Sequence, residues 1–453
     1  MAHISDLEMA KKIAEKVDAI GGATYFVGGY VRDALRGIEN KDIDFEVHGI
    51  TPAELRNILD SLGNRMEIGE SFGIFGLKGY SLDIAMPRKE EKRGIGHRNF
   101  DVIVDSNCGT YMASIRRDFT INAIMQNLLT GEIVDHFGGQ EDLKKGIIRH
   151  VNSESFIEDP LRVLRACQFA ARFGFTVSDE TIELCKTMDL KELSKERILG
   201  ELKKALLKAE KPSMFFQILR EMNQLGYWFK ELEDLIDVPQ NPKFHGEGDV
   251  WNHTMMVLDA AVDFLPAVKN PLGFMLSALT HDYGKAICTE FIKGAYHAYS
   301  HETEGLPLID SFMRRLTNEK QLIKYVLNLS EYHMKPNVLA AVNASIKSTN
   351  KLFDNSVDPE GLISIAMADG LGKIPQEDCQ NNKKFLEERL KIYREYMARP
   401  YVTGKDLIDE GLIPDEHFKE YLDFAHKLRL VGQSKESTLK QTMAMARKKG
   451  GKK

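Results

Sequence analysis

The sequence lacks the features of membrane proteins and of disulfide-stabilised proteins. Its 453 residues include five cysteines, none in a CxxC pair, so neither a disulfide framework nor a cysteine-based zinc site is expected. No apolar run approaches the roughly 20 residues of a membrane-spanning helix. Residues 1–10 carry acids and no apolar core, unlike a signal peptide. These absences predict a cytoplasmic protein without a membrane partner.

An excess of positive charge is also missing. The net charge is −6, with 61 Lys and Arg against 67 Asp and Glu. This balance argues against a uniformly basic nucleic-acid binder but allows a local basic face. Only the end of the chain, residues 447–453, is strongly basic, which is typical of a solvated terminus. The length predicts about two to four domains, because one core seldom holds so many residues.

The first third of the chain mixes strand and helix patterns. Apolar residues mark strands at 24–29 and 42–47, and they recur at helical spacing from Pro52 to a stop at Gly63. Further elements expected in this part are a hairpin around Lys78-Gly79, a charged loop at 88–101, a helix at 115–129 and a strand at 131–139.

After about residue 150 the strand patterns almost vanish. Helical spacing runs through residues 159–175, 191–207, 212–229, 253–265 and 383–397. The sequence thus predicts an α+β head followed by an all-α body. The predicted boundaries are a head at 1–147, a helical neck at 148–238, a second domain at 239–398 and a helical tail with a basic end at 399–453.

Two acids stand one residue apart in the strand-like segment "DIDFEV". Alternation along a strand places Asp42 and Asp44 on the same side. Carboxylates on one face repel each other unless a cation lies between them. Hard oxygen ligands suit Mg²⁺, which shares its shell with substrate phosphates. Asp83 in "SLDIAM" is a candidate third catalytic acid. The alternative is an edge strand with solvated acids.

A glycine turn precedes these acids. Gly28 and Gly29 follow an apolar strand and open a predicted helix, where bare N–H groups can bind an anion. The guanidinium of Arg32 can form two hydrogen bonds to a phosphate. A phosphate site beside a two-acid magnesium site is typical of nucleotidyl transfer. The glycine spacing differs from that of a P-loop.

The segment "FVGGYVRDALRGIENKDIDFEV" resembles the first signature of the class II, bacterial-type tRNA nucleotidyltransferase and poly(A) polymerase family. The segments "IRRDFTINAI", "GEIVDHFGGQEDLKKGIIRHV" and "EDPLRVLRACQFAARFGF" match in the same order, so the resemblance covers about residues 25–175. It implies a polymerase-β-like head that adds CCA to tRNA 3′ ends from CTP and ATP without a template, by two-metal chemistry. The body and tail would then hold the acceptor stem and T-arm of tRNA.

The segment "EDPLRVLR" suggests how bases are selected. Asp159, Arg162 and Arg165 fall at i, i+3 and i+6 of a predicted helix, roughly on one face. A carboxylate beside a guanidinium fits the amino donor and ring-nitrogen acceptor of cytosine and adenine, and it misfits guanine and uracil. A plain helix cap at Asp159 is the alternative reading.

The resemblance assigns base reading to Asp159 and Arg162, with Arg165 and Arg117 as further nucleotide contacts. The family often carries an arginine where this chain has Gln168. A contact at that position is therefore weaker here or supplied by another residue.

A second group of candidate ligands lies in the body. On separate predicted helices stand His253, His281, Asp282 and Asp369, with His301 and His333 as further candidates. Such residues can converge on a divalent metal such as Mg²⁺, Mn²⁺, Ni²⁺ or Fe²⁺. The pattern, including "HDYGK", resembles the HD phosphohydrolase domain, which implies phosphatase or 2′,3′-cyclic phosphodiesterase activity. An inactive HD fold is the alternative.

Other functions fit parts of these patterns. A poly(A) polymerase, or an enzyme that adds only CC or only A, would share nearly all the predicted catalytic residues. An HD phosphohydrolase with a vestigial head is a candidate from another class. A non-catalytic RNA-binding protein is a third, but it has no use for the paired acids Asp42 and Asp44.

Overall fold

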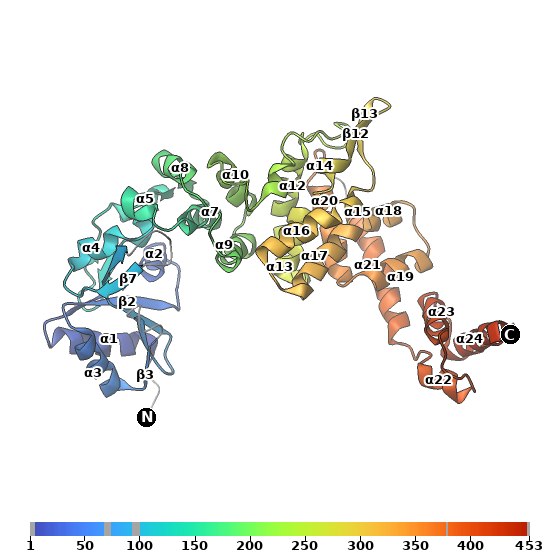
Figure 1. Ribbon diagram of the computed structural model, residues 1–453, viewed down its shortest axis with the longest axis horizontal. Coiled ribbons are helices and arrows are strands. Elements are labelled where there is room, and N and C mark those ends of the chain that lie inside the picture. The colour runs from blue at the N-terminus through green and yellow to red at the C-terminus, as the bar shows by residue number, and fades with distance from the viewer. Residues whose placement is uncertain (1–4, 68–73, 93–99, 377–378, 451–453) are drawn as a thin grey trace. The chain divides into compact units, whose positions relative to one another are not determined.

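The computed structural model describes residues 5–67, 74–92, 100–376 and 379–450 (Figure 1). The chain forms two compact units. The first holds residues Met1–Ala209 and Met214–Tyr227, and the second holds Glu210–Ser213 and Trp228–Lys453. No helix among the described residues has both the length and the apolar character to cross a membrane.

A mixed seven-stranded sheet forms the base of the first unit, with strand order β3-β4-β5-β2-β1-β8-β9. Its strands are β1 (Ala23–Val27), β2 (Ile43–His48), β3 (Arg65–Glu67), β4 (Ile74–Leu77), β5 (Leu82–Ala85), β8 (Met125–Asn127) and β9 (Ile133–Val134). Strands β2 and β5 run parallel, and the other described pairs are antiparallel. The β4–β5 pair confirms the predicted hairpin around Lys78-Gly79.

Helices α1 (Asp6–Asp18) and α3 (Pro52–Leu62) pack against the apolar face of this sheet. A capping box opens each helix, and Gly63 ends α3 as expected. Alternation along β2 sends Ile43, Phe45 and Val47 into the shared core. Since strand side chains alternate, Asp44 must lie on the opposite face.

Shorter elements complete the first unit. They are α2 (Gly29–Leu35), β6 (Arg88–Lys92), β7 (Phe100–Val104), α4 (Gly109–Ile115), η1 (Thr120–Asn122), α5 (Gly139–Lys145), β10 (Ile147–Ile148), α6 (Ser153–Phe156), α7 (Leu161–Phe173), β11 (Thr176–Val177), α8 (Asp179–Lys186), α9 (Lys195–Lys208) and α10 (Ser213–Glu221). Strands β10 and β11 form a parallel pair, so this part of the body is not purely helical.

Two predictions in the first unit were wrong. The helix expected at 115–129 is instead a turn, the 3₁₀ helix η1 and strand β8. The buried carboxylate of Asp118 accepts hydrogen bonds from the Phe119 N–H at 2.8 Å and the Asn122 side chain at 3.0 Å, which favours a turn over a helix. The charged segment 88–101 was expected to be a loop, but β6 and β7 pair as a hairpin, with 93–99 outside the described residues.

The second unit is built mainly from helices. Its elements are α11 (Lys230–Glu233), α12 (Val250–Ala261), η2 (Val262–Ala267), α13 (Pro271–Thr280), α14 (Lys285–Cys288), β12 (Thr289–Ile292), β13 (Ala295–Ala298), α15 (His301–Glu304), α16 (Leu306–Leu316), α17 (Lys320–Tyr332), α18 (Lys335–Ala341), α19 (Ile346–Asn355), α20 (Pro359–Leu371), α21 (Gln380–Ala398), α22 (Gly404–Asp409), α23 (Phe418–Leu430) and α24 (Lys435–Gly450). Helices α13 and α20 are apolar and buried on nearly all sides, so they form the centre of the unit.

The expectation of an all-α body fails at the hairpin formed by β12 and β13. These strands pair antiparallel around Lys293 and Gly294, which both have positive φ (51° and 86°). Such a two-residue turn matches the twist of antiparallel strands. The segment "TEFIKGAYHA" carries the signal, but its strands are short and lie between helices.

Gly284, in the "HDYGK" segment, allows an unusually close approach of two backbones. A Cβ atom at this position would lie 2.0 Å from the carbonyl oxygen of His301. A side chain of any size would therefore push α15 away from the turn that carries His281 and Asp282.

We predict that Gly284→Ala destabilises the second unit by about 1–3 kcal/mol, because the added methyl group forces the backbone apart. Gly200→Ala in α9 is the matched control, since its Cβ would meet no atom within 4 Å. It should raise stability by about 0.5–1 kcal/mol through helix propensity. Thermal unfolding followed by circular dichroism measures both. A Gly284→Ala variant that melts with the wild type would contradict the close approach.

Candidate functional site

Three carboxylates lie close together at interior strands of the head sheet. Asp44 on β2 lies directly opposite Asp83 on β5 in the parallel register, and Asp42 immediately precedes β2 rather than lying within it. Burial, followed by the charges of Asp83 and Asp42, raises the pKa of Asp44 to about 6. A divalent cation would relieve this repulsion, and the three sets of hard oxygen atoms fit Mg²⁺.

The glycine turn leaves the sheet beside these acids. Phe26 pairs with Phe45 across β1 and β2, so the residues after β1 lie at the Asp44 end of β2. Gly28 has φ 62° and ψ −129°, a backbone conformation that favours glycine. A Cβ at Gly28 would lie 3.3 Å from a terminal nitrogen of Arg117. The turn therefore lies directly against a guanidinium group.

Arg117 links the turn to the acids. Its charge lowers the pKa of Asp44, in opposition to burial. Its Nη2 donates a hydrogen bond to Glu46 at 2.7 Å. Glu46 is buried, which by itself would raise its pKa, but Arg117, His48 and Arg116 together lower that pKa to about 2. Ionised Glu46 thus holds Arg117 between the turn and the acids.

Sequence reasoning missed Glu46. The signal was present, because "DIDFEV" places a third acid two residues after Asp44, on the same strand face. Its role depends on Arg117, 71 residues away in the chain. That pairing could not be read from local spacing.

Arg32 is buried and already has several interaction partners, which the sequence did not suggest. Only 5% of it is exposed. Its guanidinium donates to Asp33 at 2.8 Å and to Asn122 at 2.7 Å, and it lies over the Phe173 ring at 4.8 Å. A terminal nitrogen also lies 3.5 Å from the Cβ position of Gly29. Arg32 therefore packs against the glycine turn from a buried position. Arg117 is the more exposed of these two arginines.

Asp159 lies just before α7, not on the helix as predicted. Its carboxylate accepts hydrogen bonds from Arg197 Nη2 at 2.9 and 2.8 Å, and from the Leu161 N–H at 3.1 Å. The side chain therefore both caps the helix and is fixed by an arginine. Arg197 is 38 residues away on α9, so no local pattern could have revealed it.

Arg162 and Arg165 on α7 have separate partners. Arg162 donates to the carbonyl oxygens of Ser155 at 2.6 Å and Arg116 at 2.7 Å. Arg165 donates to the buried carboxylate of Asp118 at 2.7 Å. These contacts hold the first turns of α7 against the segment that carries Arg117. Asp118 is a second important residue that is not among the predicted site residues.

Gln168 occupies a buried position, with 1% of its surface exposed. With its amide oriented to satisfy both neighbours, it donates to Glu201 at 3.2 Å and accepts from Arg172 at 3.0 Å. Burial lowers the pKa of Arg172, with Arg32 as the next cause. Arg172, one turn beyond Gln168, therefore supplies a guanidinium close to Arg32.

The second unit brings the four predicted HD residues together. His253 Nε2 lies 3.0 Å from Asp369 Oδ1 and 3.6 Å from Asp282 Oδ2. His281 Nε2 lies 3.3 Å from Asp282 Oδ2 and 3.9 Å from Asp369 Oδ1. All four side chains are buried.

Two more histidines face the same carboxylate. His301 Nε2 lies 3.1 Å and His333 Nε2 3.8 Å from Asp282 Oδ1. Each histidine donates from Nδ1 to a backbone carbonyl, that of Ala298 at 2.8 Å and that of Ser330 at 2.6 Å. This fixes the tautomer and leaves Nε2 as a lone-pair donor.

The Nε2 atoms of His281, His301 and His333 are buried, and among the described residues none has a partner aligned for a hydrogen bond. Burial and the neighbouring His281 and His301 lower the pKa of His333 to about 3, so its ring is neutral. Imidazoles and carboxylates that converge in this way fit a divalent transition metal.

Glu247 and His245, which the sequence analysis did not select, lie next to His253. Glu247 Oε1 lies 3.1 Å from His253 Nδ1 and 2.7 Å from His245 Nδ1. Both belong to the segment "FHGEGDVWNH", whose charged and imidazole side chains were the available signal. Glu247 orients His253 from behind, as outer carboxylates do for metal-binding histidines.

A cavity of about 270 Å³ opens beside this cluster of histidines and acids, the predicted HD centre. Asp282, His301 and Asp369 line one part of it, together with Lys285 and Lys373. Lys285 Nζ lies 2.7 Å from Asp282 and Lys373 Nζ 3.5 Å from Asp369. The cavity therefore gives a ligand access to both the acids and two ammonium groups.

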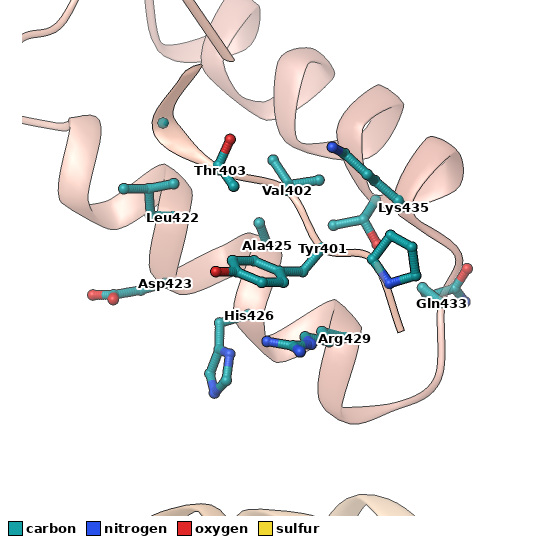
Figure 2. A pocket seen from close by; sticks show the side chains of 13 residues that line it. Tyr401, Val402, Thr403, Leu422, Asp423, Ala425, His426, Arg429, Gln433 and Lys435 are labelled. Atoms are coloured by element: carbon teal, nitrogen blue, oxygen red, sulfur yellow. The ribbon is translucent and has the colours of Figure 1, made fainter. Parts of the chain in front are cut away.

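A larger cavity, about 410 Å³, lies in the tail segment (Figure 2). Arg429 lies beside the Tyr401 ring, 4.3 Å from its centre. Lys435 is paired with Asp406 at 2.7 Å and His426 with Asp354 at 2.9 Å. None of the predicted catalytic residues lines this cavity. It is a candidate for binding and offers no catalytic group.

Known proteins resemble this chain in sequence and in fold. Residues 24–149 match the family model described as "Poly A polymerase head domain". Residues 174–236 match the model described as "Probable RNA and SrmB-binding site of polymerase A". Among solved structures, a CCA-adding enzyme in its apo form II has a TM-score of 0.68 at 21% identity, covering 97% of this chain and 95% of its own. This likeness supports a polymerase-β-like head followed by a helix-rich body.

Curated relatives match over most of the chain. The multifunctional CCA protein of Haemophilus ducreyi is 36% identical over 328 residues, 71% of this chain and 77% of its own length. That of Aliivibrio salmonicida is 35% identical over 400 residues, 85% of this chain and 93% of its own length. With this identity and coverage, the chain belongs to the multifunctional CCA protein family, within the tRNA nucleotidyltransferases and poly(A) polymerases.

Proposed function

We propose that this chain adds CCA to the 3′ ends of tRNA, with CTP and ATP as substrates and without a nucleic-acid template. The observation that carries the proposal is the set of three acids beside an arginine-backed glycine turn. The relatives named multifunctional CCA protein support the activity. A Thermotoga maritima CCA-adding enzyme complexed with tRNA supports the substrate, at 20% identity and a TM-score of 0.64. Acting on tRNA, the protein would work in the cytoplasm.

The head residues would have separate roles in metal binding and triphosphate binding. Asp42, Asp44 and Asp83 would hold Mg²⁺, which when bound polarises the α-phosphate and stabilises the pyrophosphate that leaves. Gly28 and Gly29 leave room for the triphosphate, and Arg117 carries the positive charge that faces it. Arg32 fixes the turn and adds to the positive field from a buried position.

Base selection is assigned to Asp159 and Arg162, with Arg165 in support. Asp159 accepts from the exocyclic amino group of cytosine or adenine, and a guanidinium donates to the ring nitrogen. Arg197 orients the Asp159 carboxylate through two hydrogen bonds. Arg162 and Arg165 keep α7 in place through Ser155 and Asp118.

The domain assignment that goes with this function keeps a head at 1–147, a neck at 148–238, an HD domain at 239–398 and a tail at 399–453. The neck, HD domain and tail would hold the acceptor stem and T-arm of tRNA. The match of residues 174–236 to an RNA-binding model supports this for the neck.

We infer a second activity at the HD centre, a metal-dependent phosphohydrolase acting on phosphate esters at nucleotide ends. His253, His281, Asp282 and Asp369 would hold a divalent metal such as Mg²⁺, Mn²⁺ or Ni²⁺, which when bound activates water for attack on phosphorus. Two observations support this assignment: the tautomers are fixed, and the buried Nε2 atoms have no aligned hydrogen-bond partner among the described residues. Lys285 and Lys373 offer positive charge to a phosphate in the adjoining cavity.

Asp44→Ala should lower CTP and ATP incorporation by roughly 10³-fold or more, because one of the converging carboxylates is lost. The assay extends a tRNA transcript that lacks its 3′ end with CTP, ATP or both, and sizes the products. Asp18→Asn, an exposed acid on α1, is the matched control and should act as wild type. Unlimited A tails on generic RNA would instead establish the poly(A) polymerase reading. Retained incorporation in Asp44→Ala would contradict the three-carboxylate site, whereas a wild type that incorporates no nucleotide would favour the HD phosphohydrolase with a vestigial head.

Asp159→Asn should reduce the preference for CTP over UTP by roughly 5- to 100-fold, since the amide can also donate to a carbonyl. Single-nucleotide incorporation rates measure this ratio. Glu158→Gln changes the exposed neighbouring acid and should leave the ratio unchanged. An unaltered ratio in Asp159→Asn would show that Asp159 serves only as a helix cap.

His281→Ala should abolish metal binding at the HD centre and lower hydrolysis of 2′,3′-cyclic AMP by roughly 10²-fold or more. Calorimetric titration of chelator-treated protein with Mn²⁺ or Ni²⁺ measures binding independently of activity. His417→Ala, in the exposed tail segment, controls for loss of a histidine. Unchanged metal affinity in His281→Ala would refute the assignment. CCA addition should persist in this variant.

A further inference from the structure

Aromatic side chains gather at the cavity beside the HD centre. Phe244, Tyr296 and Tyr299 line it and are 55%, 36% and 68% exposed. Single exposed aromatic residues are common on protein surfaces. Three that share one cavity with metal-ligand candidates indicate a surface kept for a ligand.

Tyr296 lies on β13 of the β12–β13 hairpin and Tyr299 directly follows that strand, so the hairpin leads into the segment that carries His301. Tyr299 stands two residues before His301, and the chain turns between them at Ser300, with φ 58°. The rings of His297 and Tyr299 are stacked, with centroids 5.1 Å apart and an angle of 6° between the rings. Since both residues line the cavity, a flat pair of rings lies close to the phosphohydrolase centre.

The same cavity also has the chemistry of a phosphate site. Lys285 and Lys373 line it beside Asp282 and Asp369. The cavity volume, about 270 Å³, is near the lower end of the roughly 300–1,000 Å³ usual for ligand sites. Flat rings and ammonium groups that line one cavity match the base and the phosphate of a single nucleotide.

We propose that the β12–β13 hairpin is a base-stacking platform, with Tyr299 as its main contact, that makes the HD centre select phosphate esters carried by a nucleotide. This inference rests on the phosphohydrolase activity proposed above. Stacking suits any base, because every base has a π face. The hairpin would therefore select for a nucleotide end without selecting its sequence.

The reaction assigned to this site is the opening of a 2′,3′-cyclic phosphate. A water oxygen attacks phosphorus, the bond from phosphorus to one ribose oxygen breaks, and that oxygen takes up a proton from the water. The product is a phosphomonoester on the other ribose oxygen. The stacked base places the ribose so that its phosphate reaches Lys285 and Lys373.

The test compares 2′,3′-cyclic AMP with glycerol 1,2-cyclic phosphate, which has a cyclic diester but no base. Tyr299→Ala should lower kcat/KM for the nucleotide by roughly 5- to 100-fold, mainly through KM, and leave the glycerol ester unchanged. Tyr299→Phe keeps the ring and should retain nearly full activity. Phe291→Ala is the matched control, an exposed hairpin aromatic that contacts Tyr296 but does not line the cavity. Equal losses on both substrates, or none, would overturn the platform.

A binding measurement separates this proposal from the activity it rests on. Calorimetric titration of chelator-treated full-length protein with 2′-AMP should show weaker binding in Tyr299→Ala than in the wild type. The head is identical in both, so the difference reports the hairpin. Equal binding would overturn the platform, whereas a wild type without hydrolysis would overturn only the phosphohydrolase. An oligoribonucleotide ending in a 2′,3′-cyclic phosphate, tested beside the free nucleotide, shows which source the platform accepts.

Discussion

The parallel pairing of β2 with β5 is the constraint on which the head depends. It sets Asp44 directly opposite Asp83 and leaves Asp42 one residue outside the strand. The apolar alternation of β2 holds this register, because a slip by one residue would bury Asp44 and expose Phe45. Packing of α1 and α3 on the opposite face therefore holds a set of mutually repelling acids together at two interior strands.

Charges in both units are arranged before any ligand binds. Glu46 holds Arg117, Asp118 holds Arg165, and Arg197 holds Asp159. In the second unit, backbone carbonyls fix the histidine tautomers and Glu247 orients His253. Such preorganisation lets a site stabilise developing charge without rearranging its own dipoles. This preorganisation is found in two different sites, one with three carboxylates and one rich in imidazoles.

Several strands, turns and helix ends could be predicted from the sequence, because their signal is local. The strands at 24–29 and 42–47, the stop of α3 at Gly63 and the β4–β5 hairpin all follow from periodicity and turn residues. The helix expected at 115–129 failed because Asp118 and the pairing of β8 with β1 outweighed helical spacing. The β12–β13 hairpin was missed because short strands among helices carry a weak pattern.

The sequence by itself determined that Asp42 and Asp44 flank one strand position after a glycine turn, and that histidines and acids recur along the helical body. These are local facts, set by the period of a strand and the conformational freedom of glycine. Only the tertiary structure decided that Asp83 faces Asp44, that Arg197 fixes Asp159, and that His301 and His333 join His281 around Asp282. The physical reason is distance along the chain: such contacts depend on strand register and helix packing, which no local spacing encodes.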